Sequence, residues 1–183
     1  MKALTLSPDE ALTRLRDGNQ KWLAHQPFEH LNVEDVQDLV EGQSPYAVVI
    51  TCSDSRVIPE AIFDANTGDL FVIRTAGNTI GDEAMGSIEY AIEHLGTPLV
   101  LILGHTQCGA INAAIHGETG THIDAIVKRI TVNIDHETDA YKACCLNVKQ
   151  EVAKVRKDVK SINDQAKVVG GVFSIETGKV TFL

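Results

Sequence analysis

The sequence Tyr46-Ala47-Val48-Val49-Ile50 is a continuous apolar run, and the polar stretch Thr51-Cys52-Ser53-Asp54-Ser55-Arg56 follows it directly. Unbroken apolar runs rich in β-branched residues are typical of strands that are buried on both faces of a parallel sheet. Similar runs occur at residues 70–73 and 99–103, and residues 168–173 supply a fourth. The sequence therefore predicts four buried strands.

Helical patterns separate the strands. They cover residues 82–95, ended by Gly96, and residues 106–116, ended by Gly117. Strands that alternate with helices predict βαβ units, and hence an α/β fold with a mostly parallel central sheet of four strands flanked by helices. The C-terminal residues 173–180 have the pattern of a hairpin, which would add an antiparallel edge strand.

The N-terminal part has a different pattern. Ser7-Pro8-Asp9-Glu10 is a typical helix start, with Ser as N-cap, Pro at the first helical position and Glu three residues after the cap. Apolar residues recur behind it at helical spacing as far as Trp22, and a shorter helix is expected at residues 33–40. We expect one domain over residues 1–183, with a helical arm at 1–42 and an α/β core at 46–183.

Composition excludes several function classes. The chain has 183 residues, with 25 acidic against 16 basic residues and a net charge of -9, which argues against nucleic acid as a partner. Its one basic stretch, residues 149–160, alternates in sign and is expected to form a solvated helix face. No apolar run reaches the roughly 18 residues that span a bilayer, and the first residues lack a signal-peptide pattern, so we expect a cytoplasmic protein without membrane contact.

Potential metal ligands follow two of the predicted strands. Cys52 comes directly after the first, and Gly104-His105-Thr106-Gln107-Cys108-Gly109 follows the third. In open parallel sheets, ligands bind beyond the carboxyl ends of the strands, so these side chains should converge on one edge. Zinc favours thiolate and imidazole ligands, and a catalytic zinc site has three protein ligands and one open position. The alternative is that both cysteines are small buried hydrophobes and His105 is a turn residue.

Asp54 and Arg56 lie two residues apart in the loop after the first strand. They could form a surface ion pair, worth about 0–1 kcal/mol. Alternatively, Arg56 keeps Asp54 ionised and directed at the open position of the metal. There the carboxylate could accept a hydrogen bond from a zinc-bound hydroxide, or it could bind the zinc itself as a fourth ligand and inactivate the enzyme.

The two segments Cys52-Ser53-Asp54-Ser55-Arg56 and Gly104-His105-Thr106-Gln107-Cys108-Gly109 resemble the paired signature of the β-class carbonic anhydrases. The segment between them, residues 68–78, is similar to the second-strand region of that family. The resemblance is dense from residue 46 to 117 and resumes more loosely at residues 168–183.

The resemblance implies a site and a reaction. One zinc ion per chain would be held by Cys52, His105 and Cys108, with Asp54 and Arg56 as the catalytic dyad. The backbone amide of Gly109 would donate to bound bicarbonate. The reaction would be the reversible hydration of carbon dioxide to bicarbonate and a proton by attack of zinc-bound hydroxide. Two thiolates donate more charge than imidazoles do, so activity should rise with pH.

Two positions depart from the family pattern. Many relatives place a glutamine from the neighbouring subunit in the site, and the matching residue here is Asn66, which either binds substrate from the partner or is a turn residue. Relatives that bicarbonate inhibits allosterically have Trp three residues before the first ligand, where this chain has Val49. We expect the second bicarbonate pocket to be absent and Asp54 to stay off the metal at neutral pH.

Several questions stay open at this point. The same site could hydrolyse carbonyl sulfide or carbon disulfide, or the chain could bind zinc without catalysis; a redox protein is disfavoured because no C-x-x-C is present. Cys144 and Cys145 receive no role. Relatives are dimers or dimers of dimers whose first helix covers the partner, so we expect a homodimer or homotetramer. No proton shuttle can be chosen among His94, His116, His122 and His136.

Overall fold

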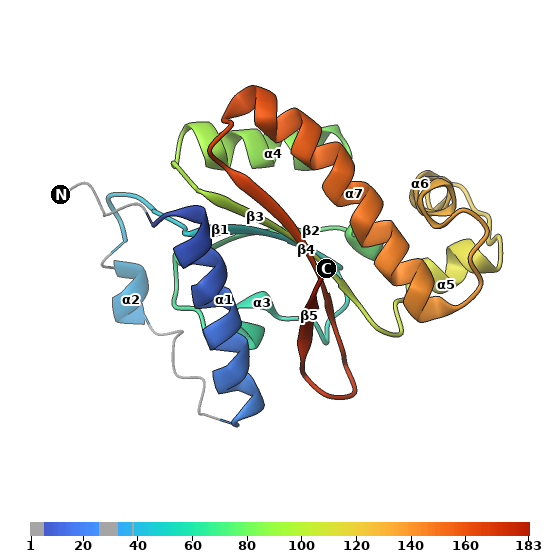
Figure 1. Ribbon diagram of the computed structural model, residues 1–183, viewed down its shortest axis with the longest axis horizontal. Helices are drawn as coiled ribbons and strands as arrows, with labels where there is room; N and C mark the ends of the chain where they lie inside the picture. Colours follow the sequence, from blue (N-terminus) through green and yellow to red (C-terminus); the bar gives the residue numbers. More distant parts are fainter. Residues whose placement is uncertain (1–5, 26–32, 38) are drawn as a thin grey trace.

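The computed structural model describes residues 6–25, 33–37 and 39–183, which form one five-stranded sheet with helices on both faces (Figure 1). The strands are β1 (Ala47–Thr51), β2 (Leu70–Arg74), β3 (Leu99–His105), β4 (Lys167–Phe173) and β5 (Val180–Phe182). The helices are α1 (Pro8–Leu23), α2 (Val33–Gln37), α3 (Pro59–Ile62), α4 (Asp82–Glu93), α5 (Gly109–Ile115), α6 (Asp124–Ile134) and α7 (Ala140–Ile162), with a 3-10 turn η1 (Ala76–Asn78) after β2.

The predicted sheet is confirmed. The strand order is β2-β1-β3-β4-β5, with parallel pairing from β2 to β4 and antiparallel pairing between β4 and β5. All residues of β1 and β3 are buried, as their unbroken apolar runs predict for central strands. Because β1 and β3 are parallel neighbours, their carboxyl ends bring Cys52 and His105 to the same edge of the sheet.

Each face of the sheet has its own hydrophobic core. On one face, α4 and α7 cover Val48 and Ile50 of β1 together with alternate residues of β3 and β4 (Figure 1). On the other face, α1 and α3 cover Ala47 and Val49. A third cluster lies where α5, α6 and α7 meet beyond the sheet edge; its buried members are Cys52, Cys108, Ile111, Ala113, Ala114, Val127, Ile130, Ile134 and Ala143.

Helix α1 begins as predicted and packs on its own chain. Ser7 is the N-cap, and its hydroxyl and the Glu10 carboxylate form a complete capping box. Ala11 and Leu15 are fully buried in the core that α1 shares with the sheet. Gly18 allows the closest approach, because a Cβ there would lie 1.8 Å from the Phe63 carbonyl oxygen.

Some predicted boundaries and one predicted surface were wrong. Helix α5 begins at Gly109 rather than at residue 106, because β3 continues to His105 and Gln107 adopts a left-handed φ of 57°. Helix α4 ends at Glu93 rather than at residue 95. For the helix expected at residues 33–40, the structure describes α2 over Val33–Gln37. In α7 the charged residues at 149–160 do not all face solvent, since Glu151 is 1% exposed and hydrogen-bonded inside the protein. Over the described residues, no helix combines the length and the apolar character needed to cross a bilayer.

Candidate metal centre

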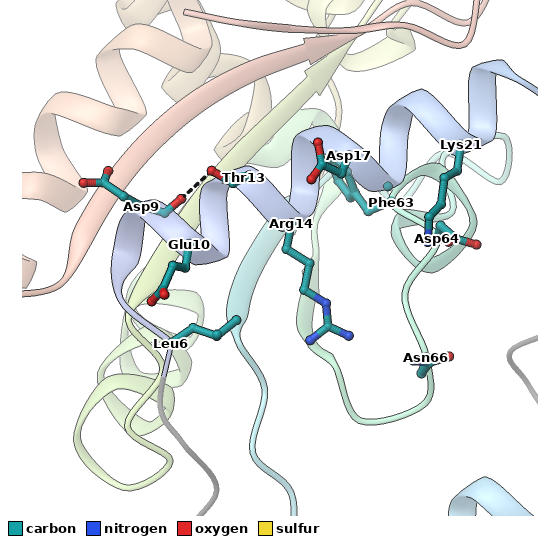
Figure 2. Close-up of a pocket in the computed structure, with 11 residues that line it drawn as sticks. Leu6, Asp9, Glu10, Thr13, Arg14, Asp17, Lys21, Phe63, Asp64 and Asn66 are labelled. Carbon is teal, nitrogen blue, oxygen red and sulfur yellow. Dashed lines mark hydrogen bonds and ion pairs between the residues drawn. The ribbon is translucent and has the colours of Figure 1, made fainter.

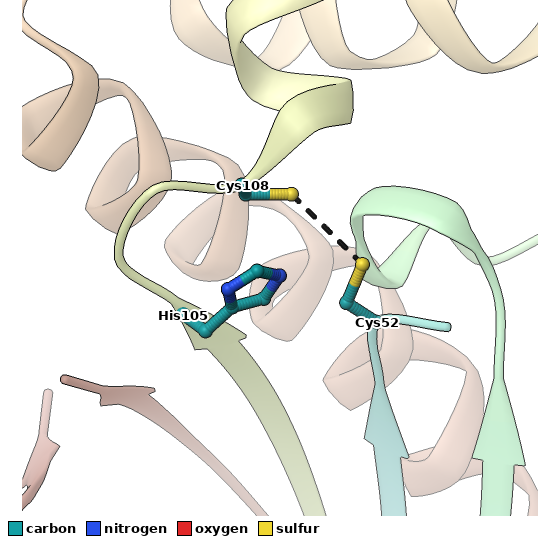
Figure 3. A group of neighbouring side chains, drawn as sticks. All are labelled: Cys52, His105 and Cys108. Carbon is teal, nitrogen blue, oxygen red and sulfur yellow. Dashed lines mark hydrogen bonds between the residues drawn. The ribbon is translucent and has the colours of Figure 1, made fainter. Parts of the chain in front are cut away.

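Three potential metal ligands meet at the carboxyl edge of the sheet (Figure 3). Cys52 follows β1, His105 ends β3, and Cys108 is the N-cap residue of α5. All three are buried, and their ligating atoms lie within 4.8 Å of one another. The structure therefore brings together the cluster that the sequence predicts.

The protonation and spacing of these atoms fit a zinc ion. His105 Nδ1 lies 2.8 Å from the Thr106 carbonyl oxygen, which can only accept, so Nδ1 carries the proton. Its Nε2 atom is buried without a hydrogen-bond partner, and the imidazole ring lies next to the two cysteine side chains (Figure 3). The Sγ atoms of Cys52 and Cys108 are 3.9 Å apart. A tetrahedral ion with zinc–sulfur bonds of about 2.3 Å would separate two sulfurs by about 3.8 Å.

A hydrogen bond links the two thiols. A hydrogen bond from Cys108 holds the pKa of the Cys52 thiol well below its usual range, and the Gly77 amide contributes in the same direction. The same Cys52–Cys108 bond, together with burial, raises the pKa of Cys108. The pair thus resists holding two negative charges by itself. A divalent cation between the sulfurs removes this repulsion, because a coordinating thiol is deprotonated outright.

Asp54 and Arg56 form a bidentate pair, and the Asp54 carboxylate lies beside the cluster. The Arg56 Nε and Nη2 atoms donate to the two carboxylate oxygens at 2.9 and 2.8 Å, and the Arg56 backbone amide adds a third bond at 2.9 Å. These bonds hold the pKa of Asp54 well below its usual range. The Asp54 Oδ2 atom lies 3.9 Å from His105 Nε2, and the carboxylate is not one of the three clustered ligands.

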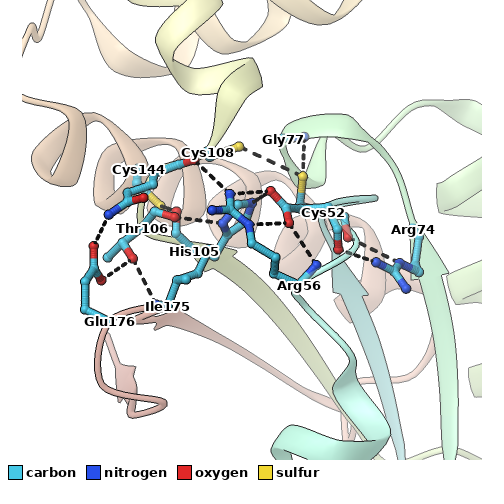
Figure 4. Close-up of polar contacts among 12 residues, drawn as sticks. Cys52, Arg56, Arg74, Gly77, His105, Thr106, Cys108, Cys144, Ile175 and Glu176 are labelled. Atoms are coloured by element: carbon cyan, nitrogen blue, oxygen red, sulfur yellow. Dashed lines mark hydrogen bonds and ion pairs between the residues drawn. The ribbon is translucent and has the colours of Figure 1, made fainter.

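Two charged residues that the sequence analysis did not single out hold the loops of the site (Figure 4). Arg74, at the end of β2, donates to the backbone carbonyls of Cys52 and Asp54 at 3.3 and 2.6 Å. Glu176, in the β4–β5 hairpin, accepts from Thr106 Oγ1 at 2.7 Å and from Gln107 Nε2 at 2.6 Å. Arg74 is the last residue of β2 and Glu176 follows the end of β4, so a position at the carboxyl end of a parallel strand is the signal that could have identified both.

Cys144 lies behind the cluster but does not belong to it. Its thiol donates to the His105 carbonyl oxygen at 3.4 Å, and burial raises its pKa to about 12. This thiol is engaged with a backbone carbonyl and is not among the mutually close ligand atoms. The cluster over the described residues therefore consists of Cys52, His105 and Cys108.

Comparison with known proteins places this arrangement in a family. The fold aligns with a β-carbonic anhydrase from Coccomyxa, solved in complex with acetazolamide, with a TM-score of 0.75 and 26% identity over 94% of this chain and 86% of that one. A sequence model of the carbonic anhydrase family matches residues 47–180. The chain belongs to the β-carbonic anhydrase family. The matched residues contain the whole metal cluster and nearly the whole predicted α/β core.

Curated relatives in this family are similar over the same region. Carbonic anhydrase 2 of Mycobacterium tuberculosis is 40% identical over 134 residues, and a carbonic anhydrase of Mycolicibacterium smegmatis is 42% identical over 134 residues. Each alignment covers 70% of this chain and 65% of the relative. The chain thus spans slightly less than two thirds of the length of these carbonic anhydrases.

Asn66, one of the two substrate-binding residues that the family resemblance implies, is not brought to the cluster within one chain. It lies in the turn before β2, at the amino end of the parallel strands, where its backbone amide donates to Asp69 Oδ2 at 2.8 Å. Asn66 lines a cavity of about 640 Å³ beside α1, together with Arg14 and Asp64 (Figure 2). None of the three potential metal ligands lines this cavity, so it is separate from the candidate metal centre.

Gly109, the other residue implied by the carbonic anhydrase resemblance, is the first residue of α5 and follows the potential ligand Cys108 directly. The four histidines considered as proton shuttles are all exposed and lie outside the metal cluster. His94 packs on Tyr90, with ring centroids 5.2 Å apart, and His116 Nδ1 contacts the Asn112 carbonyl oxygen at 2.8 Å. The structure gives none of them a contact with the site.

Proposed function

We propose that this chain catalyses the reversible, zinc-dependent hydration of carbon dioxide to bicarbonate and a proton. The observation that carries the proposal is the buried cluster of Cys52, His105 and Cys108, with an unpartnered His105 Nε2 and the Asp54–Arg56 pair beside it. A structural zinc site would normally have a fourth protein ligand and would need neither member of that pair. This contrast favours an enzyme over a protein that binds zinc without catalysis.

Three side chains would hold the metal. Cys52 and Cys108 would bind through their sulfurs and His105 through Nε2, while the Thr106 carbonyl oxygen fixes the orientation of the imidazole ring. When bound, Zn²⁺ lowers the pKa of a coordinated water towards neutrality and so supplies the nucleophile. Every other contribution comes from residues of the chain itself.

Asp54 would orient the reacting water. Its carboxylate lies next to His105 Nε2 and is kept ionised by the Arg56 guanidinium, so it can accept a proton in a hydrogen bond. Because both of its oxygens are bound by Arg56, Asp54 is held away from direct coordination of the metal.

Val49, which stands where bicarbonate-regulated relatives have Trp, is fully buried in the core. We therefore also propose that cooperative inhibition by bicarbonate is absent.

Carbonyl sulfide and carbon disulfide are the nearest rival substrates, since both are linear triatomic molecules like carbon dioxide. The proposed enzyme is tested by stopped-flow measurement of carbon dioxide hydration between pH 6 and 9, with carbonyl sulfide hydrolysis run in parallel. Hydration that rises with pH is expected. Zinc-loaded protein without hydration activity would overturn the proposal, and faster turnover of carbonyl sulfide would reassign the substrate.

We further propose that the protein is a homodimer or a homotetramer. Strand β2 is an edge strand of the sheet, and its apolar residues 70–73 are only half-buried. Such an edge favours pairing with another chain. In the assembly, Asn66 and the Gly109 amide are the groups proposed to contact the substrate.

The four free cysteines, two of which must be reduced to bind metal, favour the cytoplasm as the compartment.

A further inference from the structure

Gly77 contacts one of the metal ligands through its backbone. Its amide donates to Cys52 Sγ at 3.3 Å, and this is the contact through which η1 reaches the site (Figure 4). The residue adopts a left-handed φ of 66°, and a Cβ at this position would lie 2.7 Å from the Ile130 side chain. The amide can therefore reach the sulfur only while Gly77 keeps this unusual conformation against α5 and α6.

A side chain from α7 fixes the carbonyl group of Gly77. Asn147 Nδ2, on α7, donates to the Gly77 carbonyl oxygen at 3.0 Å. Asn147 is fully buried, so water cannot replace this bond. Fixing the carbonyl oxygen fixes the rotation of the Gly77 backbone, and with it the direction of the amide that contacts Cys52.

Asn147 is itself held by a buried polar group. Its Oδ1 atom accepts from Asn133 Nδ2 at 2.9 Å, and the same Nδ2 donates to the buried Glu151 carboxylate at 2.9 Å. Lys154 closes the arrangement, because its Nζ atom donates to Asn133 Oδ1 at 2.7 Å and lies 3.7 Å from Glu151. Burying a carboxylate and two amides is costly unless each is hydrogen-bonded, as these are.

We propose that Asn147 is a positioning residue for the metal ligand Cys52, acting through Gly77, and that Asn133, Glu151 and Lys154 keep it in place. The inference rests on the metal site of the proposed function. A hydrogen bond to a metal-bound thiolate withdraws charge from the sulfur, and groups that support ligands typically change metal affinity by about 10–100-fold when they are mutated.

The test uses the cobalt-substituted protein, in which thiolate-to-metal charge transfer absorbs in the near ultraviolet. Asn147→Asp keeps the shape of the side chain but replaces its donor with an acceptor that repels the Gly77 carbonyl. We expect the charge-transfer band to move to longer wavelength, because the sulfur retains more charge, and Co²⁺ to bind about tenfold more weakly. An unchanged band and an unchanged affinity would overturn the inference.

Asn19→Asp is the matched control. Asn19 is also a buried asparagine, and it links the backbones of Ile62, Gly178 and Val180 without contacting η1. A comparable loss of stability is expected, with the charge-transfer band in its wild-type position. If both variants shift the band equally, Asn147 has only a structural role. Wild-type protein without any thiolate-to-cobalt band would instead overturn the metal site, and the inference with it.

A second measurement uses only the wild-type protein, so it does not depend on whether a variant folds. In wild-type protein loaded with ¹¹³Cd, a hydrogen bond from the Gly77 amide to a metal-bound sulfur should give a scalar coupling between the amide proton and the cadmium nucleus. Detection of the coupling on Gly77 supports the proposed contact. Its absence, with cadmium bound by both cysteines, would overturn it.

Discussion

Among single residues, Cys108 and Cys144 form a matched pair, because both are buried thiols near His105 but only Cys108 belongs to the metal cluster. Cys108→Ser removes one of three protein ligands, so we expect the zinc content of dialysed protein to fall to background in elemental analysis. Cys144→Ser removes only a weak hydrogen bond to a carbonyl and is expected to retain one zinc ion per chain. Equal zinc contents in the two variants would contradict the ligand assignment.

Replacing Asp54 is expected to lower turnover without changing the metal content, because Asp54 lies outside the ligand cluster and is held by Arg56. Asp54→Asn removes the charge that accepts a proton, so carbon dioxide hydration should fall by about a hundredfold or more. Zinc content and the stopped-flow rate of carbon dioxide hydration are measured on the same sample. Asp158→Asn, which makes the same change at an exposed position, is the control. Loss of zinc from Asp54→Asn would show that Asp54 is a permanent fourth ligand.

At the scale of the elements, the packing of α1 on α3 depends on Gly18. Helix propensity alone favours Gly→Ala by about 1 kcal/mol. At Gly18, however, the new Cβ would meet the Phe63 backbone, and overpacking costs about 1–3 kcal/mol or more. We expect Gly18→Ala to lower the free energy of unfolding in urea by about 2 kcal/mol. Gly86→Ala, on an exposed position of α4 with open space around it, should raise it by up to about 1 kcal/mol, and equal effects would refute the close contact.

The β4–β5 hairpin fixes the ligand loop through a carboxylate, which makes that link dependent on pH. Hydrogen bonds from Thr106 and other donors lower the pKa of Glu176 to about 2. A carboxyl with a lowered pKa stabilises the folded protein above its unfolded pKa of about 4.5, and this contribution is lost as the pH falls towards 2. At pH 7 the free energy of unfolding should therefore be larger for the wild-type protein than for Glu176→Gln, and this difference should shrink below about pH 4.5. Urea unfolding of both proteins at each pH measures the difference. A difference that does not change with pH would contradict the stabilising role of the ionised Glu176 carboxylate.

On the scale of the whole molecule, β2 leaves one edge of the sheet without a partner strand in the described chain. We expect light scattering at micromolar concentration to give at least the mass of a dimer. Val72→Lys places a charge in the middle of this edge strand and should shift the protein towards the monomer. Val132→Lys, on an exposed position of α6, is the control that should leave the mass unchanged. A monomeric wild-type protein would refute the assembly.

The sequence predicts the parts of this fold that depend on local pattern. Apolar runs identify every strand of the parallel sheet, and the rule for the carboxyl ends of strands brings Cys52 to His105. Glu151 was expected in solvent because charge alternation on a helix does not reveal a buried amide that can bind a carboxylate. The role of Glu176 was missed for a related reason, since its partners Thr106 and Gln107 are about 70 residues away in the sequence.

The cluster formed by α5, α6 and α7 contains Cys52 and Cys108, the two cysteines proposed to bind zinc, among its aliphatic residues. A bound ion would therefore complete one corner of the hydrophobic core. An ion that binds only the folded chain stabilises it by mass action. In a cell, a shortage of zinc would loosen this corner and expose the newly made chain to proteases and chaperones. If the proposed zinc site is occupied in this way, we expect the lifetime of the polypeptide, and with it the amount of protein in the cell, to depend on the supply of the metal.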